Sequence, residues 1–233
     1  MKVDSNFVMS INGDAVTTEH TQPVYNPATR AVFAQVPDAS REQLDQTVGF
    51  ARAALKGWAA TPAEGRQAAL ERYASLIEAH AEEFVSLLTR EQGKPKAGAE
   101  WEVFGSVDWL RAVASQRLPD EVVEDGDHRR VVTRFTPVGV VGAIVPWNFP
   151  VFLAVSQIAT AFGAGNRAMV KMSENSRHLT RLLQELSPQY LPEDKLFFIE
   201  ETGGVGIEFS KLAFDLIIFT GSGATGKKVM ASA

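Results

Sequence analysis

An uncharged stretch from Phe135 to Asn166 constrains the fold more than any other feature of the chain. A run of this length could cross a membrane if it were continuously helical. Pro146, Asn148 and Pro150 interrupt it, however, and a turn exposed to lipid would leave backbone groups without hydrogen-bond partners. We therefore interpret the stretch as a buried strand, a sharp turn and a buried helix of a globular protein.

The composition narrows the class of protein further. Hydrophobic residues make up 45% of the chain and the net charge is −5, which is typical of globular proteins and offers no basic surface for nucleic acid or anionic membranes. The chain has no cysteine, so disulfides, thiolate metal sites and a cysteine nucleophile within it are excluded. Its four histidines lie far apart, and we expect no metal site. The N-terminus has no signal-peptide pattern, and a cytoplasmic location is expected.

The N-terminal part is expected to form short strands and turns before its first helix. Residues 7–40 contain turn signals at 12–14 and 26–27. Ser40 then begins a helix, and Gln43 stands three residues later, where it can close a capping box.

Two further helices are expected in the N-terminal half. Residues 61–64, Thr-Pro-Ala-Glu, predict a helix start with proline in the first position and glutamate closing the box. This helix is expected to break near His80 and to stop at Gly93 and Pro95. A third helical pattern runs over 97–115.

The C-terminal half alternates strands with helices. The expected strands are 138–145, 168–172, 196–199 and 216–219. The expected helices are 151–162, 179–186 and one from residue 224 onward. This alternation predicts an α/β fold, a Rossmann-like parallel sheet with helices on both faces, preceded by a helical N-terminal segment.

Ligands of such sheets bind beyond the carboxyl ends of the strands. The loop after the fourth strand is rich in glycine, and Ser222 stands where the next helix starts, so this turn could bind phosphate. A plain turn capped by Ser222 is an equally good interpretation. No Gly-x-Gly-x-x-Gly follows the first strand, which disfavours other Rossmann-type oxidoreductases.

Three polar residues follow the first two strands. Glu174 could bond a ribose 2′-hydroxyl and repel a 2′-phosphate, and Lys171 could share the ribose. The alternative is that the two form a solvated surface pair. Asn148 could donate its amide to a developing oxyanion. The residues alone favour the alternative that Asn148 caps the following helix.

Taken together, these motifs resemble the NAD(P)-dependent aldehyde dehydrogenase superfamily over essentially all 233 residues. The segment from 140 to 219 is closest to coniferyl aldehyde dehydrogenases. The motifs that carry the resemblance are Pro137–Gly142 with Pro146–Pro150, Phe219–Ser222 with Gly226, Gly163–Asn166 before Lys171 and Glu174, Asn26–Thr29, Trp58 and Glu91–Pro95.

The resemblance implies oxidation of an aldehyde to a carboxylic acid by a cysteine thiolate, with NAD as cofactor and NADP as the alternative. It implies that Asn148 donates to the oxyanion, against the capping interpretation. The cofactor contacts that it implies are Ile144, Val145, Pro146, Trp147, Lys171, Ser173, Glu174, Gly204, Phe219, Thr220, Gly221, Ser222, Thr225 and Gly226.

The resemblance also implies what this chain does not contain. The family's general-base glutamate, its nucleophilic cysteine and its catalytic domain lie beyond the position that matches Ala233, so we expect an incomplete, cofactor-binding portion that is inactive alone. The expected domains are 1–118, N-terminal strands and helices packed on the cofactor domain; 119–137, a strand of the oligomerisation segment; and 138–233, the NAD-binding domain. Gly223 stands where the family usually has threonine, and Met172 where proline is frequent.

Two alternatives remain open at this point. The chain could be a non-catalytic dinucleotide-binding module. It could also be a fragment of a mosaic, because 1–130 resemble the long-armed, tetrameric branch and 140–219 the short-armed one. The strand at 216–219 could form an exposed sheet edge, so we expect a homo-oligomer or poor solubility.

Overall fold

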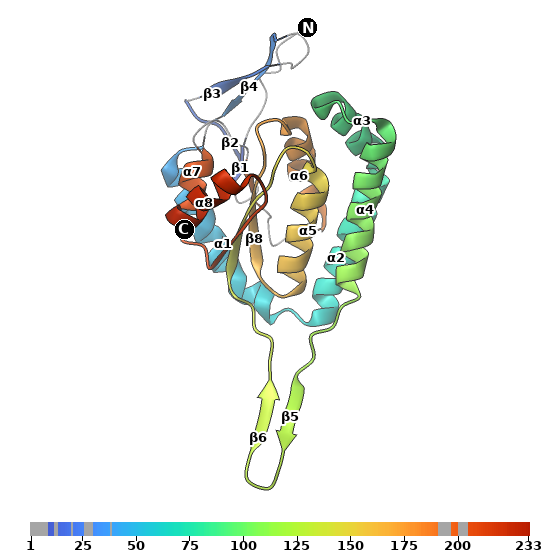
Figure 1. Cartoon of the computed structure of the whole chain (residues 1–233), viewed down its shortest axis with the longest axis vertical. Helices are drawn as coiled ribbons and strands as arrows, with labels where there is room; N and C mark the ends of the chain where they lie inside the picture. Colours follow the sequence, from blue (N-terminus) through green and yellow to red (C-terminus); the bar gives the residue numbers. More distant parts are fainter. Residues whose placement is uncertain are drawn as a thin grey trace.

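The computed structural model describes residues 9–11, 14–19, 21–25, 30–37, 39–190, 197–199 and 205–233 (Figure 1). Its centre is a parallel four-stranded sheet in the order β10-β7-β8-β9. The strands are β7 (Val140–Ile144), β8 (Arg167–Lys171), β9 (Phe197–Ile199) and β10 (Leu216–Phe219). The α/β fold and all four strands predicted from the sequence are therefore confirmed.

Helices cover both faces of this sheet, as predicted (Figure 1). One face carries α5 (Pro150–Gly163) and α6 (Arg177–Tyr190), with an outer layer of α2 (Ala63–Ala79), α3 (Ala81–Gln92) and α4 (Lys96–Ala114). The other face carries α1 (Arg41–Ala60), α7 (Val205–Ser210) and α8 (Gly223–Ser232). The sequence patterns did not predict α7.

A hydrophobic core lies on each face of the sheet, and the alternation of side chains along the strands separates the two cores. In β7 and the residue after it, Val141, Ala143 and Val145 belong to the core beneath α5. Val140 and Ile144 belong to the core beneath α1. Successive side chains of a strand point to opposite faces, so a strand buried on both faces must be apolar throughout. This explains the continuous apolar run in the sequence.

The helix ends in the N-terminal half test the capping predictions. Ser40 and Gln43 form the capping box of α1, as predicted. The prediction of a box at 61–64 is wrong, because the Thr61 hydroxyl donates to the Gly57 carbonyl at 3.1 Å and closes the preceding helix instead. The break at His80 is confirmed, and Gly93 ends α3 in a left-handed conformation with φ of 67°.

A carboxylate anchors the start of β7 to the start of β10. Asp215 Oδ2 accepts a hydrogen bond from the Val140 N–H at 2.8 Å, and Arg52 of α1 pairs with the same carboxylate at 3.1 Å. The Val140 N–H, followed by Arg52, lowers the pKa of Asp215. Gly139 lies against this carboxylate with φ of 133°, and its N–H donates to Asn166 Oδ1 at 3.0 Å. The amino-terminal ends of β7 and β10, opposite the carboxyl ends of the strands, are therefore tightly fixed.

Short antiparallel strands precede the first helix, as predicted. They are β1 (Met9–Ile11), β2 (Asp14–Val16), β3 (Thr21–Tyr25) and β4 (Val32–Pro37), which form two pairs. The expected turn residues Asn12, Gly13, Asn26 and Pro27 lie outside the described residues.

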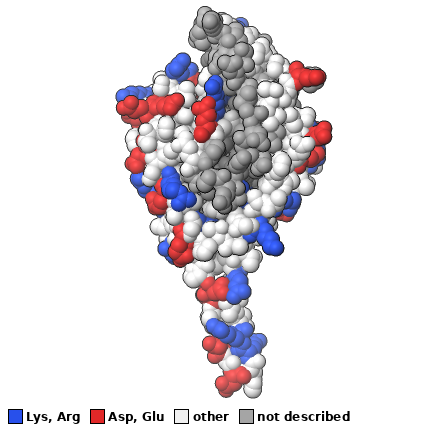
Figure 2. Space-filling view, turned by 180° about the vertical axis from the view of Figure 1, so that it is seen from behind, with Lys and Arg blue, Asp and Glu red and all other residues white. Residues whose placement is uncertain are grey.

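A hairpin of β5 (Glu121–Asp125) and β6 (Arg130–Thr133) projects from the body of the molecule (Figure 1). Its side chains are almost all exposed. Acidic and basic residues are intermixed on it and over the described surface visible from behind (Figure 2). None of the helices in the described part of the chain has the length and hydropathy needed to span a membrane.

Candidate functional site

The strand order places a switch point between β7 and β10. From β7 the chain moves outward through β8 to β9, and then returns to the other side of β7 as β10. Phe219 lies opposite Ile144 in the register, and the Thr220 N–H donates to the Ile144 carbonyl at 3.0 Å. The loops that leave these two strands therefore start side by side, where doubly wound sheets bind their ligands.

The loop after β7 presents Asn148 to solvent. Asn148 is exposed, and the residue that occupies the cap position of α5 is Phe149, which has no capping side chain. Instead, Glu102 Oε1 accepts the N–H groups of Val151 at 2.9 Å and Phe152 at 3.2 Å. The interpretation of Asn148 as a helix cap is therefore wrong, because a carboxylate from α4 already fills that role.

In the turn after β10, Ser222 caps α8 and the space around Gly223 is unoccupied. Ser222 is the cap of α8, and its Oγ accepts the Thr225 N–H at 3.2 Å and lies 2.9 Å from Thr225 Oγ1. A Cβ on Gly221 would lie 2.6 Å from the Phe219 ring, so this glycine makes room for that ring. No atom would lie within 4 Å of a Cβ at Gly223, which leaves the first turn of α8 open. The capping interpretation of Ser222 holds, and its exposure is compatible with phosphate binding as well.

Lys171 and Glu174, at the end of β8 and after it, do not form the solvated surface pair that was the alternative interpretation. Lys171 is only 4% exposed and lies beside Ile144 in the register. Glu174 is exposed, and its carboxylate accepts the Ser173 hydroxyl at 3.2 Å. Arg177 Nε donates to the Glu174 carbonyl at 2.7 Å and holds the turn. The surface-pair alternative is therefore wrong for Lys171, which is buried at the strand end.

The remaining predicted residues have different surroundings. Ile144 and Val145 are buried in the two cores, on opposite faces of the sheet. Pro146 is partly buried, and Trp147 is 55% exposed beside Asn148. Thr220 and Gly226 are partly buried in the turn around Ser222. Gly204 lies outside the described residues.

An aromatic cluster beside the Asn148 loop was not predicted from the sequence. The Trp101 ring centroid lies 5.9 Å from that of Phe149 and 6.3 Å from that of Phe152. Trp109 lies 6.1 Å from Phe152. Both tryptophans are exposed on α4, and only the packing of α4 on α5 brings them to this loop.

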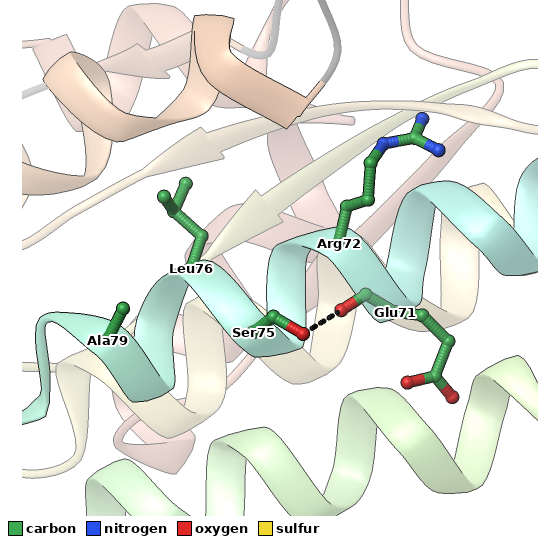
Figure 3. Close-up of a pocket in the computed structure, with 5 residues that line it drawn as sticks. All are labelled: Glu71, Arg72, Ser75, Leu76 and Ala79. Atoms are coloured by element: carbon green, nitrogen blue, oxygen red, sulfur yellow. Dashed lines mark hydrogen bonds between the residues drawn. The ribbon is translucent and has the colours of Figure 1, made fainter.

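A hollow of about 410 Å³ lies elsewhere, on α2 (Figure 3). Its described lining residues are Glu71, Arg72, Ser75, Leu76 and Ala79. The Ser75 hydroxyl donates to the Glu71 carbonyl at 3.0 Å, so it serves the helix itself. None of these residues follows a strand of the sheet, and we do not assign the site to this hollow.

Comparison with known proteins supports the same family along the chain. The aldehyde dehydrogenase family model matches residues 15–233. An aldehyde dehydrogenase of Fusarium is 33% identical over 221 residues, which is 94% of this chain and 47% of that protein. A coniferyl aldehyde dehydrogenase of Pseudomonas aeruginosa, named as probable, is 46% identical over 99 residues, which is 42% of this chain and 21% of that protein.

The solved structures agree with the sequence comparison. The NAD⁺ complex of an aldehyde dehydrogenase from Bacillus cereus matches with a TM-score of 0.88 and 29% identity. The match covers 97% of this chain and 48% of that one. The chain thus spans about half the length of the relatives that it matches from end to end. It belongs to the aldehyde dehydrogenase family.

Proposed function

We propose that this chain forms the NAD-binding part of an aldehyde dehydrogenase and carries the group that stabilises the oxyanion. The observation that carries the proposal is the meeting of two loops at the switch point. One presents the exposed Asn148, and the other presents the Ser222 turn at the start of α8. A donor for the aldehyde oxygen and a site for the cofactor phosphates would then lie in one crevice.

Asn148 is suited to the oxyanion role because its side chain has no structural duty in the helix. Glu102 satisfies the first N–H groups of α5, and this leaves the Asn148 amide for a ligand. As a nucleophile adds to the aldehyde carbon, negative charge develops on the oxygen, and an amide N–H donor stabilises it. The chain contains no cysteine, so the nucleophile of this reaction is not among its residues.

The described residues fit a dinucleotide. The N–H groups of the first turn of α8 can bind phosphate, and the absence of a side chain at Gly223 allows close approach. Glu174 is exposed at the end of β8, where an acidic side chain can accept the ribose 2′-hydroxyl. Bound NAD would supply the acceptor for the hydride of the aldehyde. We propose NAD over NADP because the Glu174 carboxylate would repel a 2′-phosphate.

Calorimetric titration tests the cofactor proposal. We expect the chain to bind NAD about tenfold more tightly than NADP, since about 1.4 kcal/mol of like-charge repulsion corresponds to that ratio. Glu174→Gln should bring the two affinities close together. Glu185→Gln, which removes an exposed charge from α6, is the matched control and should leave the ratio unchanged. Binding of neither nucleotide by the folded chain would refute the proposed function.

The aromatic cluster favours an apolar, and in particular an aromatic, aldehyde. Trp101, Phe149 and Phe152 present ring surface directly beside the Asn148 loop. An aromatic pair contributes about 0.5–1.5 kcal/mol beyond the area that it buries. We propose that the aldehyde's side chain packs against these rings while its oxygen meets the Asn148 amide.

We also propose that the β5–β6 hairpin is covered by a second copy of the chain. A two-stranded hairpin is marginally stable by itself, and Val123 on β5 is 62% exposed. Val123→Glu should therefore lower the mass of the assembly in light scattering, because a buried, unpaired charge weakens an interface. Asp127→Asn in the hairpin turn is the control. An unchanged mass in the Val123 variant would show that the hairpin is not the interface.

A further inference from the structure

One ion pair between α4 and the segment before it holds the backbone of the Asn148 loop. Lys94 Nζ donates to the Asn148 carbonyl at 2.8 Å and lies 3.9 Å from the centroid of the Phe149 ring. The same ammonium group pairs with Glu102 Oε2. The Lys94 ammonium group, which lies outside the sheet, therefore binds the main chain of the Asn148 loop.

Glu102, the partner of Lys94, binds the residues that follow the Asn148 loop. Glu102 Oε1 accepts the N–H groups of Val151 and Phe152, in the first turn of α5. A negative charge at a helix N-terminus is favourable, and this one satisfies two N–H groups of that turn. Through its two oxygens, Glu102 connects Lys94 to α5. The pair thus holds the chain on both sides of Phe149.

The burial of this pair needs an explanation other than stability. The Glu102 side chain is fully buried, and that of Lys94 is 13% exposed. A buried ion pair contributes little to stability, and well-packed apolar residues often replace it without loss. A charged pair does provide directional bonds to backbone groups, which apolar side chains cannot make. The contacts with the Asn148 loop therefore indicate that the pair fixes its geometry.

Glu91 and Gln92, which lie just before Lys94 in the sequence, bind the loop after β8 and the start of α6 in a similar way. Glu91 Oε1 accepts the His178 N–H at 2.7 Å, and Oε2 accepts the Leu179 N–H at 3.2 Å, in the first turn of α6. Gln92 Nε2 donates to the Ser176 hydroxyl at 2.9 Å. Residues 91–94 thus reach the two loops that carry Asn148 and Glu174.

We propose that Lys94 is a positioning residue that, together with Glu102, aims the Asn148 amide by fixing its main chain against α4. The functional meaning of this position rests on the proposed oxyanion role of Asn148. Independently of that role, the loop has one conformation only while Lys94 holds the Asn148 carbonyl.

Three variants of the full chain test this claim. Lys94→Met removes the donor and leaves the Glu102 carboxylate buried without its cation, so the melting temperature should fall. The double variant Lys94→Met with Glu102→Gln removes the orphaned charge, and most of the melting temperature should return. Lys96→Met makes the same substitution at an exposed position of α4 and should change nothing.

Loop order is measured separately from stability. In both Lys94 variants, chymotrypsin should cleave after Trp147 about tenfold faster, the change expected when a hydrogen bond from a charged donor is lost. The Asn148 side-chain amide and the Trp147 indole should also lose their single sharp NMR signals. If the double variant regains its melting temperature and keeps wild-type cleavage and signals, the proposal is overturned.

Two further measurements keep the test decisive. If the double variant does not fold, Lys94→Arg, which keeps the charge and a donor, must retain the loop signals that Lys94→Met loses; equal signals in both would overturn the proposal. NAD titration of the wild-type chain is independent of these readouts. Failure to bind NAD would refute the proposed function, while the loop measurements would still decide the role of Lys94.

Discussion

Replacing Gly139 with alanine should lower the free energy of unfolding by about 3 kcal/mol, from backbone strain and a displaced hydrogen-bond acceptor. Gly139 is buried with φ of 133°, a conformation that a residue with a Cβ rarely adopts. The new Cβ would lie 2.2 Å from Asp215 Oδ2. That oxygen accepts the Val140 N–H, so moving it would leave a buried donor unpaired at the start of the central strand.

Thermal unfolding measures this effect, and we expect the melting temperature to fall by roughly 10 °C for a chain of this size. Gly223→Ala is the matched control, because no atom lies within 4 Å of its Cβ position and it begins a helix. It should stabilise the chain by about 0.5 kcal/mol by restricting the unfolded state. If Gly139→Ala unfolded like the control, Asp215 would not be the anchor that we describe.

The isolated chain should form no NADH from NAD and a reactive aldehyde. Loss of a nucleophile reduces the turnover of hydrolytic enzymes by a factor on the order of 10⁶, and this chain has no cysteine. Absorbance at the nicotinamide band measures the rate. Sustained formation of NADH by the purified chain would contradict the assignment of the nucleophile to residues outside it.

A second chain that supplies the catalytic domain of a family member tests the same idea in the positive direction. If activity appears with that partner, Asn148→Ala should lower kcat by a factor of about 10² to 10³, as loss of one oxyanion donor does. Asn175→Ala, an exposed residue in the turn after β8, is the control. Reconstituted activity that is insensitive to Asn148 would support the alternative of a dinucleotide-binding module without an oxyanion role.

The limits of the sequence patterns are clearest at the start of α5. Asparagine is a preferred N-cap residue and proline is frequent in the first turn of a helix, so the residues alone favour Asn148, two positions before Pro150, as the cap. The cap is Glu102, which precedes it by more than forty residues in the sequence. Local patterns cannot detect such an acceptor, because only the packing of α4 on α5 brings the Glu102 carboxylate there. The same reasoning applies to Lys94, because its motif in the sequence supports the family resemblance and predicts no contact with the Asn148 loop.

The sequence by itself determined most of the elements and their order, although not α7. The apolar run of β7, the buried helix α5 and the capping box at Ser40 follow from periodicity and local hydrogen bonding, which involve neighbouring residues. Only the tertiary structure decided which residues meet at the site. It set the sheet order that brings the Ser222 turn beside the Asn148 loop, and it buried Lys171 and the Lys94–Glu102 pair. These depend on contacts between residues distant in the chain, whose geometry is fixed only when the helices pack on the sheet.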